Sequence, residues 1–99
     1  MVPKFGNNVT IAPGAVIYPN VEIGDNVFIG ANAVIGQRPE HRDFWHGEYM
    51  GVRIGSNVFI GSLVTIDAGT TTHTTIADNC IILRGSHIGH DAIIEEHCD

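Results

Sequence analysis

The sequence is poor in positive charge, in cysteine and in long apolar runs. Five Lys and Arg residues stand against eleven Asp and Glu residues, which gives a net charge of -6. This balance argues against nucleic acid or an anionic membrane surface as a partner. No apolar run approaches the length of a membrane span, and the start, MVPKFGNNVTIAPG, lacks the apolar segment of a secretory signal. With two cysteines and no such signal, we expect reduced thiols and a cytoplasmic protein.

What the chain does have is a repeat of six residues. Isoleucine recurs at every sixth position over three stretches, 11–35, 54–66 and 76–94, and Phe5 extends the phase one step back. The first and fifth positions of each unit are apolar or small, and they lie two residues apart across a unit boundary. A strand with one buried face requires this spacing. The fourth position is mostly Asn or Gly, the residues that adopt positive φ most easily.

Each unit is therefore expected to be a short strand followed by a tight turn. The sequence predicts an all-β fold, a parallel β-helix of slightly more than four coils, with hexads over 5–40 and 48–99 in one domain, 1–99. An α-helix is excluded, because the Gly, Asn and Pro content would break it. In this register Thr70 points inward at a fifth position, and Asn20 and Gly69 take positive φ at fourth positions.

Two segments interrupt the repeat. The first, at about 37–51, carries Phe44, Trp45 and Tyr49 and is expected to project from one corner of the coil. Exposed aromatic side chains favour a binding face covered by a ligand or another subunit, and a loop folded back on its own coils is the alternative. The second, at about 70–75, is rich in threonine and exceeds the period by four residues.

The stretch SHIGHDAI, residues 86–93, holds the candidate catalytic groups. The register turns Ile88 inward and His87 outward, and it puts His90 and Asp91 on a turn. Asp tolerates the positive φ of a fourth position, so the turn alone would explain Asp91. Imidazole titrates near neutral pH, which suits a general base, so a histidine on an exposed turn is a candidate for that role.

The repeat resembles the [ILV]-G-x-x-[VA]-x units of the left-handed β-helix acyltransferases, and the left-handed coil is taken from this resemblance. HIGHDAI is similar to the His-x-x-His-Asp segment of the UDP-N-acetylglucosamine O-acyltransferases that begin lipid A synthesis. VTIDAGT resembles their Val-Thr-Ile-His-Arg-Gly-Thr segment, and Gly47-Glu48 lies where they have Gly-Glu. The three segments occur in the family's order and at similar spacing.

The resemblance implies a general base at His90, which takes the proton from a sugar hydroxyl that attacks an acyl thioester. It implies that His87, Asp67 and Asp91 contact the substrate, a UDP-N-acetylglucosamine-type nucleotide sugar. The acyl donor would be acyl carrier protein or a coenzyme A thioester, with no bound cofactor and no metal. The family also implies a homotrimer with His90 close to a subunit boundary.

The chain departs from the family at three places. Asp67 stands where the O-acyltransferases have His; the related N-acyltransferases have Asp at this position. The first interruption lacks the lysine of the family's Gln-Asp-Leu-Lys-Tyr segment. The family's oxyanion donor and C-terminal helices follow the position at which this sequence ends. We therefore expect a truncated or minimal member without a C-terminal helical domain.

Three alternatives remain. The first is an acetyl-coenzyme A-dependent sugar acetyltransferase of the same fold, which would use the same histidine. The second is a hexapeptide carbonic anhydrase, because zinc needs three ligands and the chain has six histidines. The third is a non-catalytic β-helix that only trimerises.

The register also places both cysteines inside the coil. Cys80 and Cys98 share the fifth position and lie one coil of eighteen residues apart. Stacked coils lie about 4.8 Å apart. We therefore expect two buried, reduced thiols that act as small apolar fillers.

Overall fold

The computed structural model describes residues 2–42 and 47–97, and these residues form thirteen short β-strands. The strands are β1 (Lys4–Phe5), β2 (Thr10–Ile11), β3 (Val16–Ile17), β4 (Val21–Ile23), β5 (Phe28–Ile29), β6 (Val34–Gln37), β7 (Val52–Ile54), β8 (Phe59–Ile60), β9 (Thr65–Asp67), β10 (Thr74–Ile76), β11 (Ile81–Ile82), β12 (His87–Ile88) and β13 (Ile93–Ile94). Within these ranges no helix is long and apolar enough to cross a membrane.

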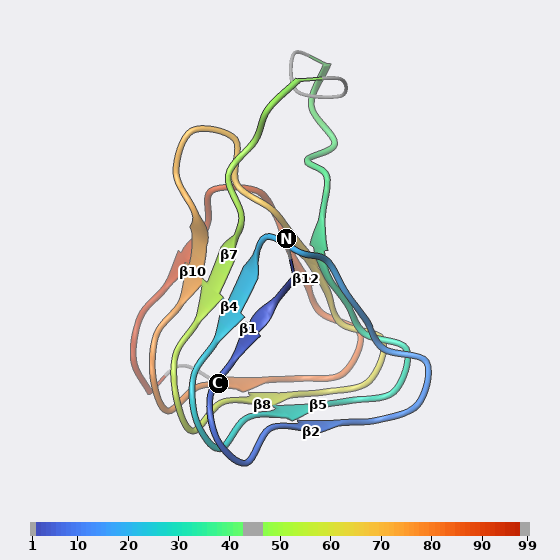
Figure 1. Ribbon diagram of the computed structural model, residues 1–99, viewed down its shortest axis with the longest axis vertical. Helices are drawn as coiled ribbons and strands as arrows, with labels where there is room; N and C mark the ends of the chain where they lie inside the picture. The colour runs from blue at the N-terminus through green and yellow to red at the C-terminus, as the bar shows by residue number, and fades with distance from the viewer. Residues whose placement is uncertain (1, 43–46, 98–99) are drawn as a thin grey trace.

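Every third strand joins the same parallel sheet, so the chain winds as a coil with three faces. Sheet A has the order β1-β4-β7-β10-β13, sheet B the order β2-β5-β8-β11, and sheet C the order β3-β6-β9-β12. Viewed along the coil, the sheets form the sides of a triangle, with sheet A at the left and sheet B at the bottom (Figure 1). Four rounds of three strands and one further strand confirm the prediction of slightly more than four coils.

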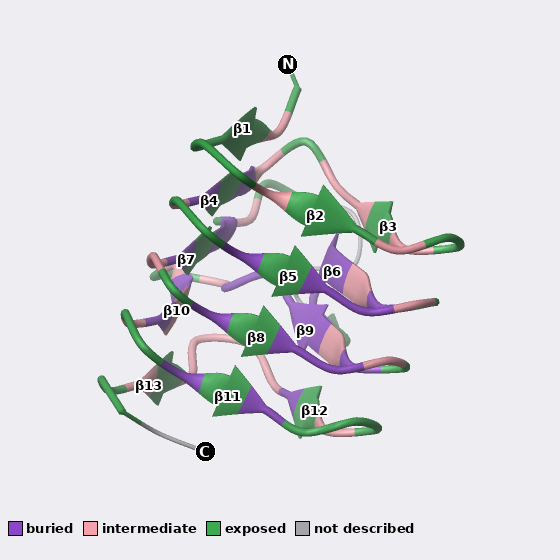
Figure 2. Cartoon of the chain, turned by 90° about the horizontal axis from the view of Figure 1, so that it is seen from below, coloured by how far each residue is buried: buried purple, intermediate pink, exposed green. Residues whose placement is uncertain are grey.

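The core lies inside the triangle and consists of the predicted inward positions. Figure 2 shows the buried segments stacked along the axis, with exposed turns at the corners. The fully or nearly fully buried side chains include Ile29, Ile35, Ile60, Ile66, Val27, Val58, Val64 and Cys80. Phe5 and Ile11 in the first coil hold the same register but are about half exposed.

The predicted turn chemistry holds at most fourth positions. Positive φ occurs at Asn8, Gly14, Asn26, Asn32, Asn57, Asn79, Gly85 and Asp91. The prediction was wrong for Asn20 and Gly69, which do not have positive φ. Asn20 immediately precedes β4 and Gly69 lies in the segment between β9 and β10, whereas Asp91 keeps positive φ at the same corner between sheets C and A.

The sequence separation between bonded residues on neighbouring coils measures how much chain leaves the coil. Asn7 and Asp25 are hydrogen-bonded across an uninterrupted coil, at a separation of 18. Asp25 and Ser56 span the coil with the first insertion at a separation of 31, and Ser56 and Asp78 span the coil with the second at a separation of 22. The first insertion is therefore much the longer, and the second is the short excess that the sequence indicated.

Both insertions leave at the corner between sheets C and A. The first joins β6 to β7 and projects furthest from the triangle, and the second joins β9 to β10 beside it (Figure 1). The second insertion covers residues 68–73, two residues earlier than predicted, because Thr74 and Thr75 belong to β10. Thr74, which is fully buried, takes the inward position that the sequence had assigned to Thr70.

Candidate functional site

The structure brings all four predicted site residues to the corner that carries the insertions. Asp67 ends β9, and His87 lies outward on β12, the strand that pairs with β9 one coil further on. His90 and Asp91 follow on the turn between β12 and β13. The site is therefore built from two successive coils, with the second insertion between them in sequence.

His90 and Asp91 form a hydrogen-bonded pair. His90 Nδ1 lies 2.8 Å from Asp91 Oδ2. Burial acts to raise the pKa of Asp91, but hydrogen bonds from Thr70, His90 and Thr72 outweigh it and hold this pKa well below its usual range. At neutral pH the carboxylate is therefore ionised and can only accept, so Nδ1 must carry the proton. In the neutral imidazole, Nε2 is then the nitrogen that can accept a proton.

The second insertion wraps around the same carboxylate. Asp91 Oδ1 accepts the backbone N–H groups of Thr70, Thr71 and Thr72 at 2.8, 3.2 and 3.1 Å, and the Thr72 hydroxyl at 3.3 Å. Asp91 Oδ2 accepts the Thr70 hydroxyl, and the Asp91 N–H donates to Thr74 Oγ1. Successive backbone N–H groups that converge on one oxygen form an anion-binding concavity, which Asp91 fills here. We call this arrangement the Asp91 clasp.

Both ring nitrogens of His87 face a polar neighbour. Its Nδ1 lies 2.7 Å from Thr65 Oγ1, and its Nε2 lies 3.8 Å from Asp67 Oδ2. The side chain is 54% exposed, so it forms part of the outer surface of sheet C, as predicted. The hydrogen bond with Thr65 orients the ring.

Asp67 is a buried carboxyl at the base of the first insertion. Its side chain is 7% exposed, and a bulge after Ile35 pairs it with Gln37, where that insertion begins. Burial raises the pKa of Asp67, His87 lowers it, Glu40 raises it and His90 lowers it further, and the net effect is a raised pKa. Such a carboxyl takes up a proton more readily than a surface aspartate does.

Sequence reasoning missed two contacts of this site. The His41 ring lies edge-on against the His90 ring, with 5.7 Å between their centroids and planes 87° apart. Thr65 was missed as the partner of His87, although the two are separated in sequence by one coil and the short second insertion. That spacing was a usable signal, whereas the path of the first insertion to His90 was not encoded in the repeat.

Backbone hydrogen bonds tie the two insertions together. Gly51 O accepts the N–H groups of Gly69 and Thr74 at 3.2 and 3.1 Å, and Met50 N donates to Gly69 O at 2.8 Å. A Cβ at Gly69 would overlap the carbonyl oxygen of Thr72, so glycine is required at this close approach. The end of the first insertion thus supports the loop that holds Asp91.

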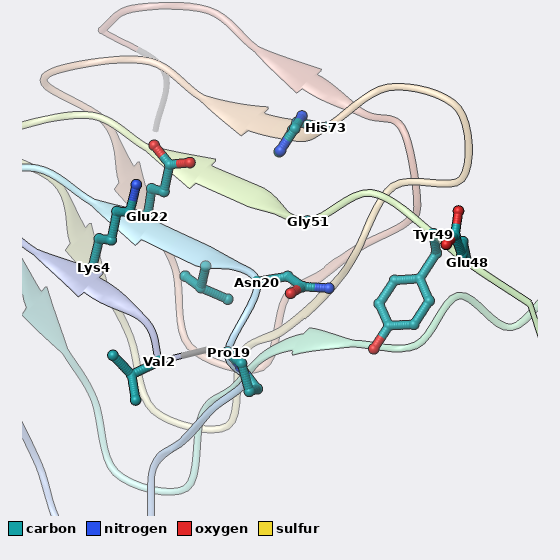
Figure 3. Close-up of a pocket in the computed structure, with 10 residues that line it drawn as sticks. Val2, Lys4, Pro19, Asn20, Glu22, Glu48, Tyr49, Gly51 and His73 are labelled. Atoms are coloured by element: carbon teal, nitrogen blue, oxygen red, sulfur yellow. The ribbon is translucent and has the colours of Figure 1, made fainter.

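A separate hollow of about 540 Å³ opens on the sheet A side of the same corner. Figure 3 shows Lys4 and Glu22 on one side of it and Glu48 and Tyr49 on the other, with Asn20 between them. None of the four predicted site residues lines this hollow. The candidate chemistry therefore lies on the open surface at the sheet C side and not in the hollow.

Some expectations fall outside the described residues. Phe44, Trp45 and Cys98 belong to segments 43–46 and 98–99. Cys80 is fully buried, as predicted, and its thiol lies 3.1 Å from Glu95 O. Across 2–42 and 47–97, no group of three His, Cys, Asp or Glu side chains is placed to hold a metal ion.

The six-residue repeat and the three parallel sheets define a class of fold. Residues 3–37 match the family model described as bacterial transferase hexapeptide (six repeats). Part of the chain thus matches the hexapeptide-repeat model, and the whole has the left-handed β-helix fold of its structural relatives.

The particular relatives are UDP-N-acetylglucosamine acyltransferases. The chain is 44% identical over 94 residues to the acyl-[acyl-carrier-protein]–UDP-N-acetylglucosamine O-acyltransferase of Campylobacter lari, which covers 92% of this chain. The crystal structure of LpxA, a UDP-N-acetylglucosamine acyltransferase from Bacteroides fragilis, is 32% identical, with a TM-score of 0.73 over 91% of this chain and 43% of its own. LpxA from Acinetobacter baumannii, 24% identical, gives the same TM-score over 96% of this chain and 42% of its own, and shows the fold alone.

The chain spans 36% of the length of its Campylobacter lari relative. The match includes the repeat that builds the coil and most of the described residues. What the relatives do as whole proteins is therefore a basis for a proposal about this chain.

Proposed function

We propose that this chain carries the acyl-transfer corner of a UDP-N-acetylglucosamine O-acyltransferase. The acceptor is a hydroxyl of a UDP-N-acetylglucosamine-type sugar, and the donor is an acyl thioester on acyl carrier protein or coenzyme A. The sugar oxygen forms the new C–O bond of the ester, the thioester C–S bond breaks, and His90 Nε2 takes the hydroxyl proton. The imidazolium then gives this proton to the thiolate that leaves.

The His90–Asp91 pair carries this proposal. Asp91 holds the proton on Nδ1, so the unprotonated nitrogen is Nε2, and the ring is 36% exposed and reachable by an acceptor. The carboxylate also stays hydrogen-bonded to Nδ1–H when the proton arrives at Nε2, so the ring keeps its orientation through the transfer. A positioned base of this kind typically contributes about 10²- to 10⁴-fold to a reaction rate.

The remaining three predicted residues divide between two roles. His87 is exposed, and the buried Asp67 lies beside it with Oδ2 3.8 Å from His87 Nε2. We assign both to the sugar, whose hydroxyl groups donate to and accept from such side chains. The Asp91 carboxylate is occupied by Thr70, Thr71, Thr72 and His90, so we assign it to holding His90 and not to contact with the substrate.

The proposed partners follow from the relatives and from the surface. The relative from Campylobacter lari is named for acyl carrier protein and UDP-N-acetylglucosamine, and we propose the same partners, in the cytoplasm and in lipid A synthesis. Two features support a homotrimer. The chain is small, so assembly would bury more of its surface. Apolar side chains also line the outer face of sheet B, where Phe28 stacks on Phe59, Ile81 follows on the neighbouring strand, and all three are exposed.

A combined binding and transfer assay tests the proposal. UDP-N-acetylglucosamine should shift the NMR signals of His87 and His90 in a saturable manner, while UDP alone should shift them less. Transfer should be measured with long-chain acyl carrier protein and with acetyl-coenzyme A, for the native chain and for His90→Ala.

The outcomes separate the rival functions. Preference for the long-chain donor with loss of transfer in His90→Ala supports the proposal. Preference for acetyl-coenzyme A would assign the chain to the sugar acetyltransferases. A folded chain that neither binds the nucleotide sugar nor transfers an acyl group from either donor would contradict catalysis and favour a module that only assembles.

A further inference from the structure

The second insertion does more than connect two strands, because it holds the carboxylate that holds His90. Thr70 donates twice to Asp91: its backbone N–H goes to Oδ1 at 2.8 Å and its hydroxyl goes to Oδ2. Oδ2 is also the oxygen that accepts His90 Nδ1. The Thr70 hydroxyl and the imidazole therefore share one acceptor atom.

We propose that Thr70 is a positioning residue for His90, acting through the Asp91 carboxylate. The expected effect of Thr70 on the transfer rate rests on the proposed function, whereas its expected effect on the tautomer of His90 does not. With the hydroxyl in place, both oxygens of Asp91 are fixed and Oδ2 faces Nδ1. Without the hydroxyl, Oδ2 keeps only His90 Nδ1 as a partner, so the direction of this oxygen is less constrained.

The three threonines of the clasp differ in a way that makes the proposal testable. The Thr72 hydroxyl donates to Oδ1, whereas His90 donates to Oδ2. Thr71 contributes its backbone N–H to the clasp, and this group survives a change of side chain. Three isosteric changes separate these roles. Thr70→Val removes the hydroxyl that donates to Oδ2, and Thr72→Val removes the hydroxyl that donates to Oδ1. Thr71→Val removes a hydroxyl outside the clasp.

Other groups around His90 act on it in different ways. The His41 ring contacts the His90 ring in a T-shaped arrangement, whereas Thr70 contacts the Asp91 carboxylate. Asp67 acts on the site through its charge, and His87 is held by Thr65 and Asp67. The tautomer of His90 should therefore respond to Thr70 even while these neighbours stay in place.

The experiment reads the tautomer directly, with ¹⁵N-labelled histidine in the full chain and the His90 signals assigned from His90→Gln. The native protein and Thr71→Val should show neutral His90 with the proton on Nδ1. Thr70→Val should move this ring toward a mixture of the two tautomers, Thr72→Val should move it less, and Thr70→Ser should restore the native state. A Thr70→Val spectrum equal to that of Thr71→Val overturns the proposal.

Transfer kinetics give a second, separate readout. Thr70→Val should lower kcat about fivefold with KM changed less than about twofold, because the lost hydrogen bond orients the base and does not bind the substrate. A changed KM with native kcat and a native tautomer would contradict the positioning role. If no variant transfers an acyl group, the proposed function fails, and the tautomer still decides the role of Thr70.

Discussion

Replacing Asp91 should lower the free energy of unfolding far more than replacing another aspartate at a corner of the coil. In Asp91→Ala, the N–H and hydroxyl of the part-buried Thr70 lose their acceptor, while the exposed N–H groups of Thr71 and Thr72 can turn to water. Two bonds to a charged group contribute about 1–1.5 kcal/mol each in a partly exposed setting. Alanine at the observed φ of 65° adds about 1 kcal/mol. The free energy of unfolding should therefore fall by about 3–4 kcal/mol.

Two further variants separate these contributions. Asp91→Asn tolerates positive φ and keeps one acceptor oxygen, so the loss should be about 1.5–2 kcal/mol. Asp78→Ala is the matched control, because Asp78 accepts one exposed backbone N–H, from Ser56 at 2.7 Å, and lacks positive φ. Its loss should be about 0.5 kcal/mol. Urea unfolding followed by circular dichroism measures all three values at pH 7.

The pH dependence tests the electrostatic part of this reasoning. The folded protein holds the pKa of Asp91 below its usual range, because the hydrogen bonds of the clasp outweigh the effect of burial. The stabilisation is therefore complete above the unfolded-state pKa of about 4 and is lost as the pH falls through the lower, folded value. The difference between the native chain and Asp91→Asn should be full at pH 6 and shrink below pH 4. A difference that is independent of pH, or no larger than that of Asp78→Ala, would refute the clasp as described.

Other expectations can be checked with standard methods. His90→Ala should lose at least about a hundredfold in transfer rate with an unchanged circular dichroism spectrum, and His87→Ala should lose less; full activity of His90→Ala would remove the general base from the proposal. Burial raises the pKa of Asp67, so the native chain should lose stability as the pH rises through that raised value, and Asp67→Asn should not; parallel stability curves between pH 4 and pH 8 would contradict this. Cys80 is fully buried and should react with a polar thiol reagent only after unfolding, and rapid labelling of the native chain would refute its assigned position. Light scattering should give a homotrimer at micromolar concentration, and a stable monomer there would exclude it.

The fold could be predicted because each hexad repeats the same local rules. Ile29, Ile60 and Ile82 are interchangeable in register, and the phase that resumes at Ile54 already implied that the first insertion leaves and returns at one corner. Loop residues do not obey such rules. The threonine run allowed either Thr70 or Thr74 at the inward position, since side-chain type does not distinguish them.

The candidate site was predictable only in part. His87, His90 and Asp91 could be assigned to the outer surface from their positions in the hexad, and positive φ at Asp91 followed from the turn. The hydrogen bonds of the Asp91 carboxylate could not be predicted, because their donors lie mostly in the second insertion, which belongs to the preceding coil. The hexad defines where the insertion starts and ends but not the direction of its N–H groups.

The register described for the three sheets has a practical consequence for protein engineering. Strand pairing continues through an uninterrupted coil and past both insertions, so the stack is insensitive to the length of the chain that leaves at this corner. The corner between sheets C and A therefore accepts loops of different length without a change in strand register. Replacing residues 38–49 with the segment of another member should keep the scaffold while exchanging the surface beside His90. The same β-helix would in this way present different surfaces beside His90, one loop at a time.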